Sequence, residues 1–268
     1  VDYFKNMKVI IIGGAGFIGS HLADYLVKKK FNVKIIDNLS SGRIENLKTI
    51  KKKIKFFQID ISKKGKWHKE FKKVDYVFHL AALSDIVPSI DKPEKYFHSN
   101  VTGTLNVIEA CKKYKVKKLI YSASSSCYGI PRNYPTKEGE KINPQYPYAL
   151  TKYIGEQLII YWSKIYKINY MSLRLFNVYG PRSRTSGTYG AMFGVFLAQK
   201  LNNKPFTLVG DGTQSRDFTY VSDVVSAFYI AAKSKLTNKI YNVGSGKTIQ
   251  VKKIIKLLGG EYIKIPKR

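Results

Sequence analysis

The sequence predicts an α/β fold, namely a doubly wound parallel sheet with helices on both faces and a smaller C-terminal lobe. Two observations carry this prediction: short runs rich in valine and isoleucine alternate with longer segments of helical periodicity, and runs such as KVIII and DYVFHL are apolar almost throughout. Alternation of this kind is typical of a parallel sheet. Continuous apolar runs suit strands that are covered on both faces.

The individual elements follow in chain order. We expect strands at Lys8–Ile12, Val33–Asp37, Ile54–Gln58, Tyr76–Leu80, Lys118–Ser122 and Asn169–Leu175. We expect helices at Gly16–Lys28, Pro93–Lys113 and Tyr148–Tyr166.

The character of the chain changes after Asn177, where the segment NVYGPRSRTSGTYG is rich in turn-forming residues and leads into an expected helix at Ala191–Leu201. We therefore assign residues 1–176 to a first domain and residues 177–268 mostly to a second lobe. Because KIYNVG at 239–244 has the pattern of a strand, residues 218–243 are expected to return to the first domain.

The composition suits a folded protein but is strongly basic. The chain has 268 residues, 44% of them apolar, and 47 basic against 18 acidic residues give a net charge of +29. Such a charge raises the possibility of a nucleic-acid-binding module. However, the lysines are scattered, and arginine, the preferred reader of phosphates and guanines, is scarce. We predict no nucleic-acid partner, with a basic nucleic-acid-binding module as the non-enzyme alternative.

The cysteine content and the hydropathy of the chain indicate in which cellular compartment the protein is expected. Cys111 and Cys127 cannot form a disulfide framework and lack the spacing of metal ligands, which fits a reducing cytoplasm and no metal. The longest early apolar run, Val9–Ile12, is too short for a signal peptide or a membrane span. We predict a cytoplasmic protein without a membrane partner.

A glycine-rich loop, Gly13–Gly19, follows the first expected strand and opens a helix. Gly13 permits the tight turn, Gly16 lets the backbone approach a pyrophosphate, and Gly19 lets the helix lie close to the strand. The next strand ends in Asp37, eighteen residues beyond Gly19, where a carboxylate can accept the ribose hydroxyls of an adenosine. A negative charge there repels a 2′-phosphate, so the pattern predicts NAD rather than NADP.

A tyrosine four residues before a lysine places both side chains on one helix face, but this spacing is common in the chain. It occurs four times, at Tyr25/Lys29, Tyr114/Lys118, Tyr148/Lys152 and Tyr229/Lys233. Only the third pair begins a helix soon after a serine-rich strand end, Ser122–Ser126. Ligands of such sheets bind at the carboxyl ends of the strands, so context singles out Tyr148 and Lys152.

These features occur together with the HLAA segment at 79–82, Asn100, LRLFNVYGPR at 173–182 and GDGTQSRDFTYVSD at 210–223. In this combination the sequence resembles the extended short-chain dehydrogenase/reductase family, in its NAD-dependent epimerase/dehydratase branch. It is most similar to UDP-glucose/UDP-galactose 4-epimerases.

The resemblance implies a Rossmann-type first domain that binds NAD and a second lobe that binds a UDP-sugar. It also implies a homodimer formed through helices near Pro93–Lys113 and Tyr148–Tyr166. Typical members continue beyond the position of Arg268, so the second lobe is expected to be incomplete.

The resemblance also assigns roles to residues. Ser124, Tyr148 and Lys152 are the expected catalytic residues, with Tyr148 as the base for a sugar hydroxyl. An unperturbed tyrosine titrates near about 10, and the charges of Lys152 and of the nicotinamide are expected to lower the pKa of Tyr148. Ser124 is expected to hydrogen-bond the same hydroxyl.

The expected cofactor-binding positions are Gly13, Gly16, Phe17, Ile18, Gly19, Asp37, Asn38, Ser41, Asp60, Ile61, Leu80, Ala81, Ala82, Asn100, Ser122, Tyr148, Lys152 and Phe176. The expected substrate-binding positions are Ser124, Ser125, Ser126, Tyr148, Asn177 and Arg216.

The serine-rich strand end also separates the reactions of this branch. The dehydratases carry an Asp-Glu pair directly after the serine or threonine, and the decarboxylases carry a glutamate there, whereas this chain has Ser125 and Ser126. Without an extra acid or base, a 4-keto sugar can only be reduced again, so the resemblance implies C4 epimerisation. A dehydratase, decarboxylase or reductase of the same branch is the enzyme alternative.

Three positions bear on the choice of sugar. Asn177 resembles the asparagine of the hexose epimerases and favours UDP-glucose/UDP-galactose or their N-acetyl forms. Arg216 matches the family's diphosphate-binding arginine, and arginine suits a phosphate because it pairs with it through two donors. Arg182 and Arg184 can equally bind a sugar carboxylate, which keeps a UDP-glucuronate 4-epimerase open.

Overall fold

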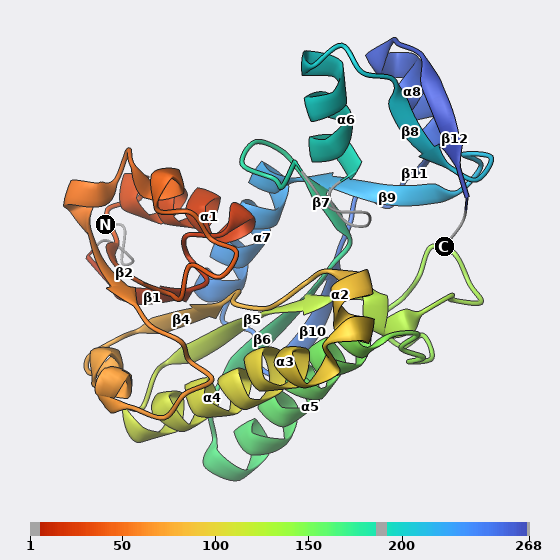
Figure 1. Ribbon diagram of the computed structural model, residues 1–268. Helices are drawn as coiled ribbons and strands as arrows, with labels where there is room; N and C mark the ends of the chain where they lie inside the picture. The colour runs from red at the N-terminus through yellow and green to blue at the C-terminus, as the bar shows by residue number, and fades with distance from the viewer. Residues whose placement is uncertain (1–5, 186–191, 267–268) are drawn as a thin grey trace.

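A computed structural model describes residues 6–185 and 192–266 (Figure 1). Its centre is a parallel seven-stranded sheet in the order β10-β6-β5-β4-β1-β2-β3. The strands are β1 (Lys8–Ile12), β2 (Asn32–Asp37), β3 (Ile54–Gln58), β4 (Tyr76–His79), β5 (Lys118–Ser124), β6 (Tyr170–Leu175) and β10 (Lys239–Val243). The predicted doubly wound fold is confirmed. The strand order reverses between β1 and β4, which is where such sheets bind ligands.

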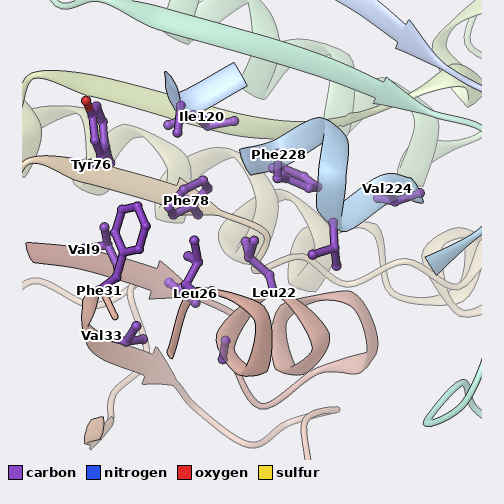
Figure 2. Packing of buried hydrophobic residues seen from close by; sticks show 14 of the residues in the cluster. Val9, Leu22, Leu26, Phe31, Val33, Tyr76, Phe78, Ile120, Val224 and Phe228 are labelled. Atoms are coloured by element: carbon purple, nitrogen blue, oxygen red, sulfur yellow. The ribbon is translucent and has the colours of Figure 1, made fainter. Parts of the chain in front are cut away.

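Helices cover both faces of this sheet. The principal ones are α1 (Phe17–Lys28), α4 (Gly103–Lys113), α5 (Pro147–Tyr166) and α7 (Val221–Lys233). In Figure 1, α4 and α5 lie on the face opposite to α1 and α7. Figure 2 shows Leu22 and Leu26 of α1 and Phe228 of α7 packing toward strand residues Val9 and Phe78 in one buried cluster. A second cluster joins α4 and α5 to the other face through Val107 and Ile159.

Two of the six predicted strands, β1 and β3, have the predicted boundaries, and the other four differ from prediction by one or two residues. The clearest case is β5, which runs to Ser124 rather than Ser122 because Ser124 still pairs with Leu175 of β6. The predicted strand at 76–80 ends at His79.

The expected helix at 93–113 consists of three pieces. They are α3 (Pro93–Phe97), a π-helical turn (His98–Thr102) and α4. Single π turns within helices often occur at functional sites, and this one carries Asn100. Between β4 and α3 lies a short helix, α2 (Ile86–Asp91). Single 3₁₀ turns occur at Ile44–Leu47, Lys51–Lys53, Lys66–Phe71 and Ser125–Tyr128.

The later part of the chain builds two small sheets beside the main one. A three-stranded sheet contains β11 (Thr248–Gln250), β9 (Ser215–Tyr220) and β7 (Asn177–Tyr179), and a two-stranded sheet contains β12 (Tyr262–Ile265) and β8 (Phe206–Val209). The helices here are α6 (Met192–Leu201) and α8 (Val251–Leu258). They share a small apolar core that includes Phe196, Phe206 and Ile254. Ala191, the expected start of α6, lies outside the described residues.

The last strand of the main sheet comes from this later part of the chain. β10 pairs in parallel with β6, and α7 packs against β5 and β6. The division into two domains, with its boundaries, stays a prediction. Both cysteines are free and buried. None of the helices in residues 6–185 and 192–266 combines the length and apolar character that a bilayer crossing requires.

Candidate functional site

A cavity of about 1340 Å³ opens at the carboxyl ends of the central strands. Its wall includes Ile12 at the end of β1, Asp37 at the end of β2, Ser124 at the end of β5 and Leu175 at the end of β6. Every predicted cofactor-binding and substrate-binding residue lines this cavity except Asn100. The fold therefore brings the candidates together from across the chain.

The three glycines of the loop meet different constraints. Gly13 has φ of +81°, and a Cβ atom there would lie 2.6 Å from the backbone nitrogen of Ala81. A Cβ on Gly19 would overlap the carbonyl oxygen of Gly13, so both positions require glycine for packing. At Gly16 a Cβ would meet only the Gly13 oxygen, at 3.2 Å. Gly16 lines the cavity just before α1 begins, so this helix start can receive a pyrophosphate, as an NAD site needs.

Asp37 is buried at the end of β2. Its carboxylate accepts hydrogen bonds from the backbone nitrogens of Ala15, at 2.9 Å, and Leu39, at 2.8 Å. Burial raises the pKa of Asp37, and these two hydrogen bonds oppose that effect. A Cβ on Gly42 would lie 2.9 Å from both carboxylate oxygens, so Gly42 gives the carboxylate its room. The carboxylate is fixed at the cavity wall, where it suits a ribose that bears free hydroxyls.

Asn100 lies behind the cavity wall and is not part of it. Its Oδ1 accepts from the backbone nitrogen of Leu83, at 2.8 Å, and its Nδ2 donates to the Leu83 carbonyl and to Thr151 Oγ1, both at 3.0 Å. These bonds occupy the amide and tie the segment after β4 to α5. The structure therefore gives Asn100 a positioning contact rather than a place at the predicted cofactor surface.

The three predicted catalytic residues meet where β5 ends and α5 begins. The side chain of Ser124 lies close enough to Tyr148 to lower the pKa of its phenol. Ser124 Oγ is also 2.7 Å from Ser126 Oγ. Lys152 is only 4% exposed, and its Nζ lies 4.3 Å from the centre of the Tyr121 ring.

The other three Tyr/Lys pairs do not line the cavity. Lys29 Nζ lies 5.6 Å from the ring centre of Tyr25, and Lys233 Nζ lies 5.2 Å from that of Tyr229. Lys118 donates to the carbonyls of Ala231 and Leu236, each at 3.1 Å, near the end of α7. Their contacts are structural.

Burial shifts the pKa values of both Tyr148 and Lys152, and the shift of Tyr148 is opposite to the predicted one. Burial raises the pKa of Tyr148 to about 12, and the hydrogen bond from Ser124 opposes this only in part. Burial lowers the pKa of Lys152 to about 7, with the charge of Glu156 opposing it. Enclosure in protein disfavours both charged forms, so the net pKa of Tyr148 is raised where the sequence predicted that it would be lowered.

The other end of the cavity carries the predicted substrate residues. Asn177 Nδ2 donates to the carbonyl of Asp217, at 3.0 Å, and Arg216 Nη1 donates to that of Ser215, at 2.8 Å. Burial raises the pKa of Tyr146, and the nearby charge of Arg216 lowers it. Most of the guanidinium of Arg216 is thus open to an anion at the cavity.

Among the residues of the cavity wall that were not predicted from the sequence, three make contacts that bear on the site. The Tyr146 ring is stacked on that of Tyr148, with centres 6.3 Å apart and planes 8° from parallel. Asp85 forms an ion pair with Arg184, which also lines the cavity and lies 99 residues further along the chain. Asn242 of β10 lines the cavity and accepts a hydrogen bond from Tyr128, at 2.7 Å. For Tyr146, its place two residues before Tyr148 was an available signal, whereas long-range contacts alone identify the other two.

The sheet order, the glycine loop and Asp37 together define a dinucleotide-binding protein of the Rossmann type, with a tyrosine, a lysine and a serine at the same cavity. Comparison with known proteins narrows this class. A sequence model of the NAD dependent epimerase/dehydratase family matches residues 9–244, and the chain belongs to this family. NAD is therefore its cofactor, as predicted.

Relatives with different substrates are similar to the chain in nearly equal measure. UDP-glucose 4-epimerase of Lactobacillus helveticus is 36% identical over 258 residues, covering 89% of this chain and 77% of that protein. UDP-glucuronate 4-epimerase of Thermodesulfobacterium geofontis is 35% identical over 261 residues, with 93% and 79% covered. The solved structure of UDP-N-acetylglucosamine 4-epimerase from Methanobrevibacter ruminantium, in complex with UDP-N-acetylmuramic acid, superposes with a TM-score of 0.94 at 36% identity, with 98% and 86% covered. The resemblance to UDP-sugar 4-epimerases is confirmed, while identity does not separate the substrates. Dehydratases and decarboxylases also occur among the relatives.

Proposed function

We propose that the protein interconverts the two C4 epimers of a UDP-hexose, either UDP-glucose and UDP-galactose or their N-acetyl forms. The observation that carries this proposal is that Ser124, Tyr148 and Lys152, the last one turn further along α5 than Tyr148, line the same cavity of a protein of an NAD-dependent family. An epimerase of this kind is an isomerase that needs no second substrate.

In this mechanism Tyr148 takes the proton of the C4 hydroxyl as the C4 hydrogen leaves as hydride, which gives a bound 4-keto sugar. NAD, when bound, supplies the acceptor for that hydride and later its donor. Ser124 hydrogen-bonds the reacting oxygen and holds it at Tyr148. Lys152 would provide the positive charge that favours the phenolate and, as the family resemblance implies, would hold the nicotinamide ribose. When the ketone is reduced on its opposite face, Tyr148 returns its proton to the C4 oxygen, and the configuration at C4 is inverted.

The cavity also supports epimerisation over dehydration. Among the described residues, the acidic residues of the cavity wall are Asp37, Asp60, Asp85 and Asp217. The carboxylate of each already has a hydrogen-bond or ion-pair partner within the protein. Asp60 accepts from Ser62, Asp85 pairs with Arg184, and Asp217 accepts from Ser245 and Gly246. The positions where dehydratases carry their acid/base pair hold Ser125 and Ser126 instead. Among the described cavity residues, the 4-keto sugar therefore meets no free carboxylate that is suited to remove water from C6.

Two arginines of the cavity wall are already paired with carboxylates, which supports a substrate whose sugar is uncharged. Arg184 pairs with Asp85, and Arg182 pairs with Asp24, at 2.7 Å. An arginine that is already paired with a carboxylate offers less to a sugar carboxylate. One observation favours the UDP-glucuronate alternative: Arg182 Nη1 is buried and has no hydrogen-bond partner among the residues that the structure describes.

The test is to incubate the purified protein with UDP-glucose, UDP-galactose, their N-acetyl forms and UDP-glucuronate, without added cofactor, and to resolve the products by chromatography. We expect interconversion of one hexose pair. Epimerisation of UDP-glucuronate alone would favour the second candidate. A 4-keto-6-deoxy product, released carbon dioxide or net NADH consumption would favour another reaction of the family, and the absence of any product would refute the proposal.

We further propose that the enzyme is a cytoplasmic homodimer that pairs through α5 and the helices beside it. Leu150, Tyr161 and Ile165 on α5 and Phe97 on α3 are large apolar side chains exposed to solvent. A second copy of the same surface would bury them. Light scattering after size-exclusion chromatography is expected to give twice the mass of one chain, and Tyr161→Arg is expected to reduce it to one chain.

A further inference from the structure

A buried ion pair lies one turn beyond Lys152, between α5 and β6. Glu156 is 1% exposed and Arg174 is 3% exposed. Arg174 Nη2 lies 2.6 Å from Glu156 Oε2, and Arg174 Nε donates to both carboxylate oxygens. Ser172 Oγ donates to Glu156 Oε1, at 2.6 Å. Three donor groups therefore fix the carboxylate in a single arrangement.

The other end of the Arg174 guanidinium holds the segment that follows β5. Its Nη1 donates to the phenol oxygen of Tyr128, at 2.8 Å, and to the carbonyl of Glu138, at 3.1 Å. Tyr128 in turn donates to Asn242 of β10. Tyr128 ends the 3₁₀ turn that begins directly after Ser124. One side chain thus connects the helix that carries Tyr148 and Lys152 to the turn that follows Ser124.

The same pair supplies the negative charge closest in sequence to Lys152. Glu156 follows Lys152 by four residues, so both project from one face of α5. The other titratable groups around the ammonium are Tyr148 on α5, Tyr121 on β5 and His79 on β4. Burial lowers the pKa of His79 to about 3 and raises that of Tyr121, so both are neutral near pH 7. Among the described residues, Glu156 is the charge that opposes the loss of the Lys152 proton.

We propose that the Glu156–Arg174 pair is a positioning unit for the catalytic residues, in which Glu156 keeps Lys152 protonated and Arg174 holds the Ser124 turn against the helix that carries Tyr148. Neither residue lines the cavity, so neither touches the substrate. The proposal deepens the proposed function and rests on its assignment of Tyr148 and Lys152.

The free-energy cost of burying an ion pair indicates that the Glu156–Arg174 pair has a role other than stabilising the fold. Removing two charges from water costs so much that a buried ion pair seldom stabilises a fold more than well-packed apolar residues of the same size. The Glu156–Arg174 pair nevertheless lies within the core, in contact with the elements that bear all three candidate catalytic residues. The geometry of this pair is suited to orienting the turn after Ser124 and to maintaining the charge of Lys152.

The test follows the titration of Lys152 directly, so it does not depend on which reaction the enzyme performs. Lysines labelled at Cε with ¹³C are titrated by NMR, and the Lys152 signal is the one that Lys152→Met lacks. In Glu156→Gln we expect its midpoint to fall by about one pH unit, the effect of removing one charge at short range. Bound NAD is expected to be unchanged. Glu109→Gln, which alters an exposed helical glutamate, is the matched control and is expected to leave the midpoint in place.

Arg174→Lys separates the two parts of the proposal. A lysine keeps the charge beside Glu156 but lacks the fork that reaches Tyr128 and Glu138. We expect an unshifted Lys152 midpoint with kcat reduced at least tenfold and KM little changed. If Glu156→Gln does not fold, the double variant Glu156→Gln/Arg174→Gln, which leaves neither partner of the pair charged, is expected to show a smaller fall in midpoint, because the opposing charge of Arg174 is removed as well.

An unchanged Lys152 midpoint in the folded glutamine variants would overturn the charge-holding role, and full activity in Arg174→Lys would overturn the positioning role. Failure of the epimerase assay in the unaltered protein would refute the proposed function while leaving the titration result readable.

Discussion

Ser124 at the end of β5 and Tyr148 at the start of α5 lie beside one another at the cavity, close enough for Ser124 to lower the pKa of the Tyr148 phenol. A hydroxyl that bridges to Ser126 and contacts the phenol of Tyr148 is placed to hold a substrate oxygen between them. This relationship makes Tyr148 the residue whose loss is expected to have the largest effect on turnover.

In Tyr148→Phe the ring stays and the base is removed. We expect NAD content to be unchanged and kcat to fall by about a thousandfold, since general-base catalysis contributes roughly 10² to 10⁴. Tyr146→Phe is the matched control, because it removes the hydroxyl of the stacked ring beside it, and we expect it to change kcat by less than about tenfold. Absorbance of released NAD and a coupled assay of the product provide the two measurements. Near-normal turnover in Tyr148→Phe would contradict the role of this residue as the base.

The glycine loop predicts opposite outcomes for two similar substitutions. A methyl group at Gly19 would overlap the backbone of Gly13, so we expect Gly19→Ala to lower the free energy of unfolding by about 3 kcal/mol. A methyl group at Gly16 meets only one atom at 3.2 Å, so we expect Gly16→Ala to change this free energy by less than about 1 kcal/mol. Because Gly16 faces the cavity, this second variant is expected to lose at least tenfold in NAD affinity. Urea unfolding and NAD titration check both, and a stable Gly19→Ala variant would show that the loop relaxes.

Burial of Lys152 predicts a pH dependence of stability. Its pKa is about 7 in the folded protein and about 10.4 in an unfolded chain, so the unfolded chain binds more protons between these values. The contribution of Lys152 to the free energy of unfolding therefore rises with pH from about 7 to about 10, by at most about 1.4 kcal/mol per pH unit. We expect urea unfolding of the unaltered protein and of Lys152→Met to show this difference in slope. Parallel curves would mean that Lys152 keeps an ordinary pKa when folded.

The Asp85–Arg184 ion pair predicts how sugar preference changes. Asp85→Asn removes the carboxylate that neutralises Arg184 and leaves an unpaired positive charge at the cavity. We expect the ratio of kcat/KM for UDP-glucuronate to that for UDP-glucose to rise at least tenfold. Asp91→Asn, an exposed position at the end of α2, is the control. A fall in this ratio in Asp85→Asn would exclude Arg184 from contact with the sugar.

Much of this architecture was predictable because local patterns encode it. The apolar runs gave the first six strands of the main sheet to within two residues, since buried parallel strands tolerate few polar side chains. The glycine loop was predictable because each of its three glycines sits where a side chain would obstruct the turn, the approach of a pyrophosphate or the packing of the helix against the strand. The candidate cofactor and substrate residues lie at strand ends, and a parallel sheet brings such ends to one edge.

Contacts between distant segments were not predictable from spacing. Asn100 is a polar side chain near the site, yet its amide is occupied by Leu83 and Thr151. The pKa shift of Tyr148 depends on how completely the protein encloses it, which no local pattern reports. The pairing of Asp85 with Arg184 requires the loop after β7 to lie beside the loop before α2, and only the tertiary structure shows this.

The position of β10 at the edge of the main sheet has a consequence during synthesis. β6 is made about sixty residues before the strand that covers its outer side. At a translation rate of roughly 5 to 20 residues per second, its open edge waits about 3 to 12 seconds on the ribosome for its partner. An unpaired strand edge is a template for association with other chains. The nascent chain is therefore most exposed to misassociation, and most in need of a chaperone, in the interval between β6 and β10.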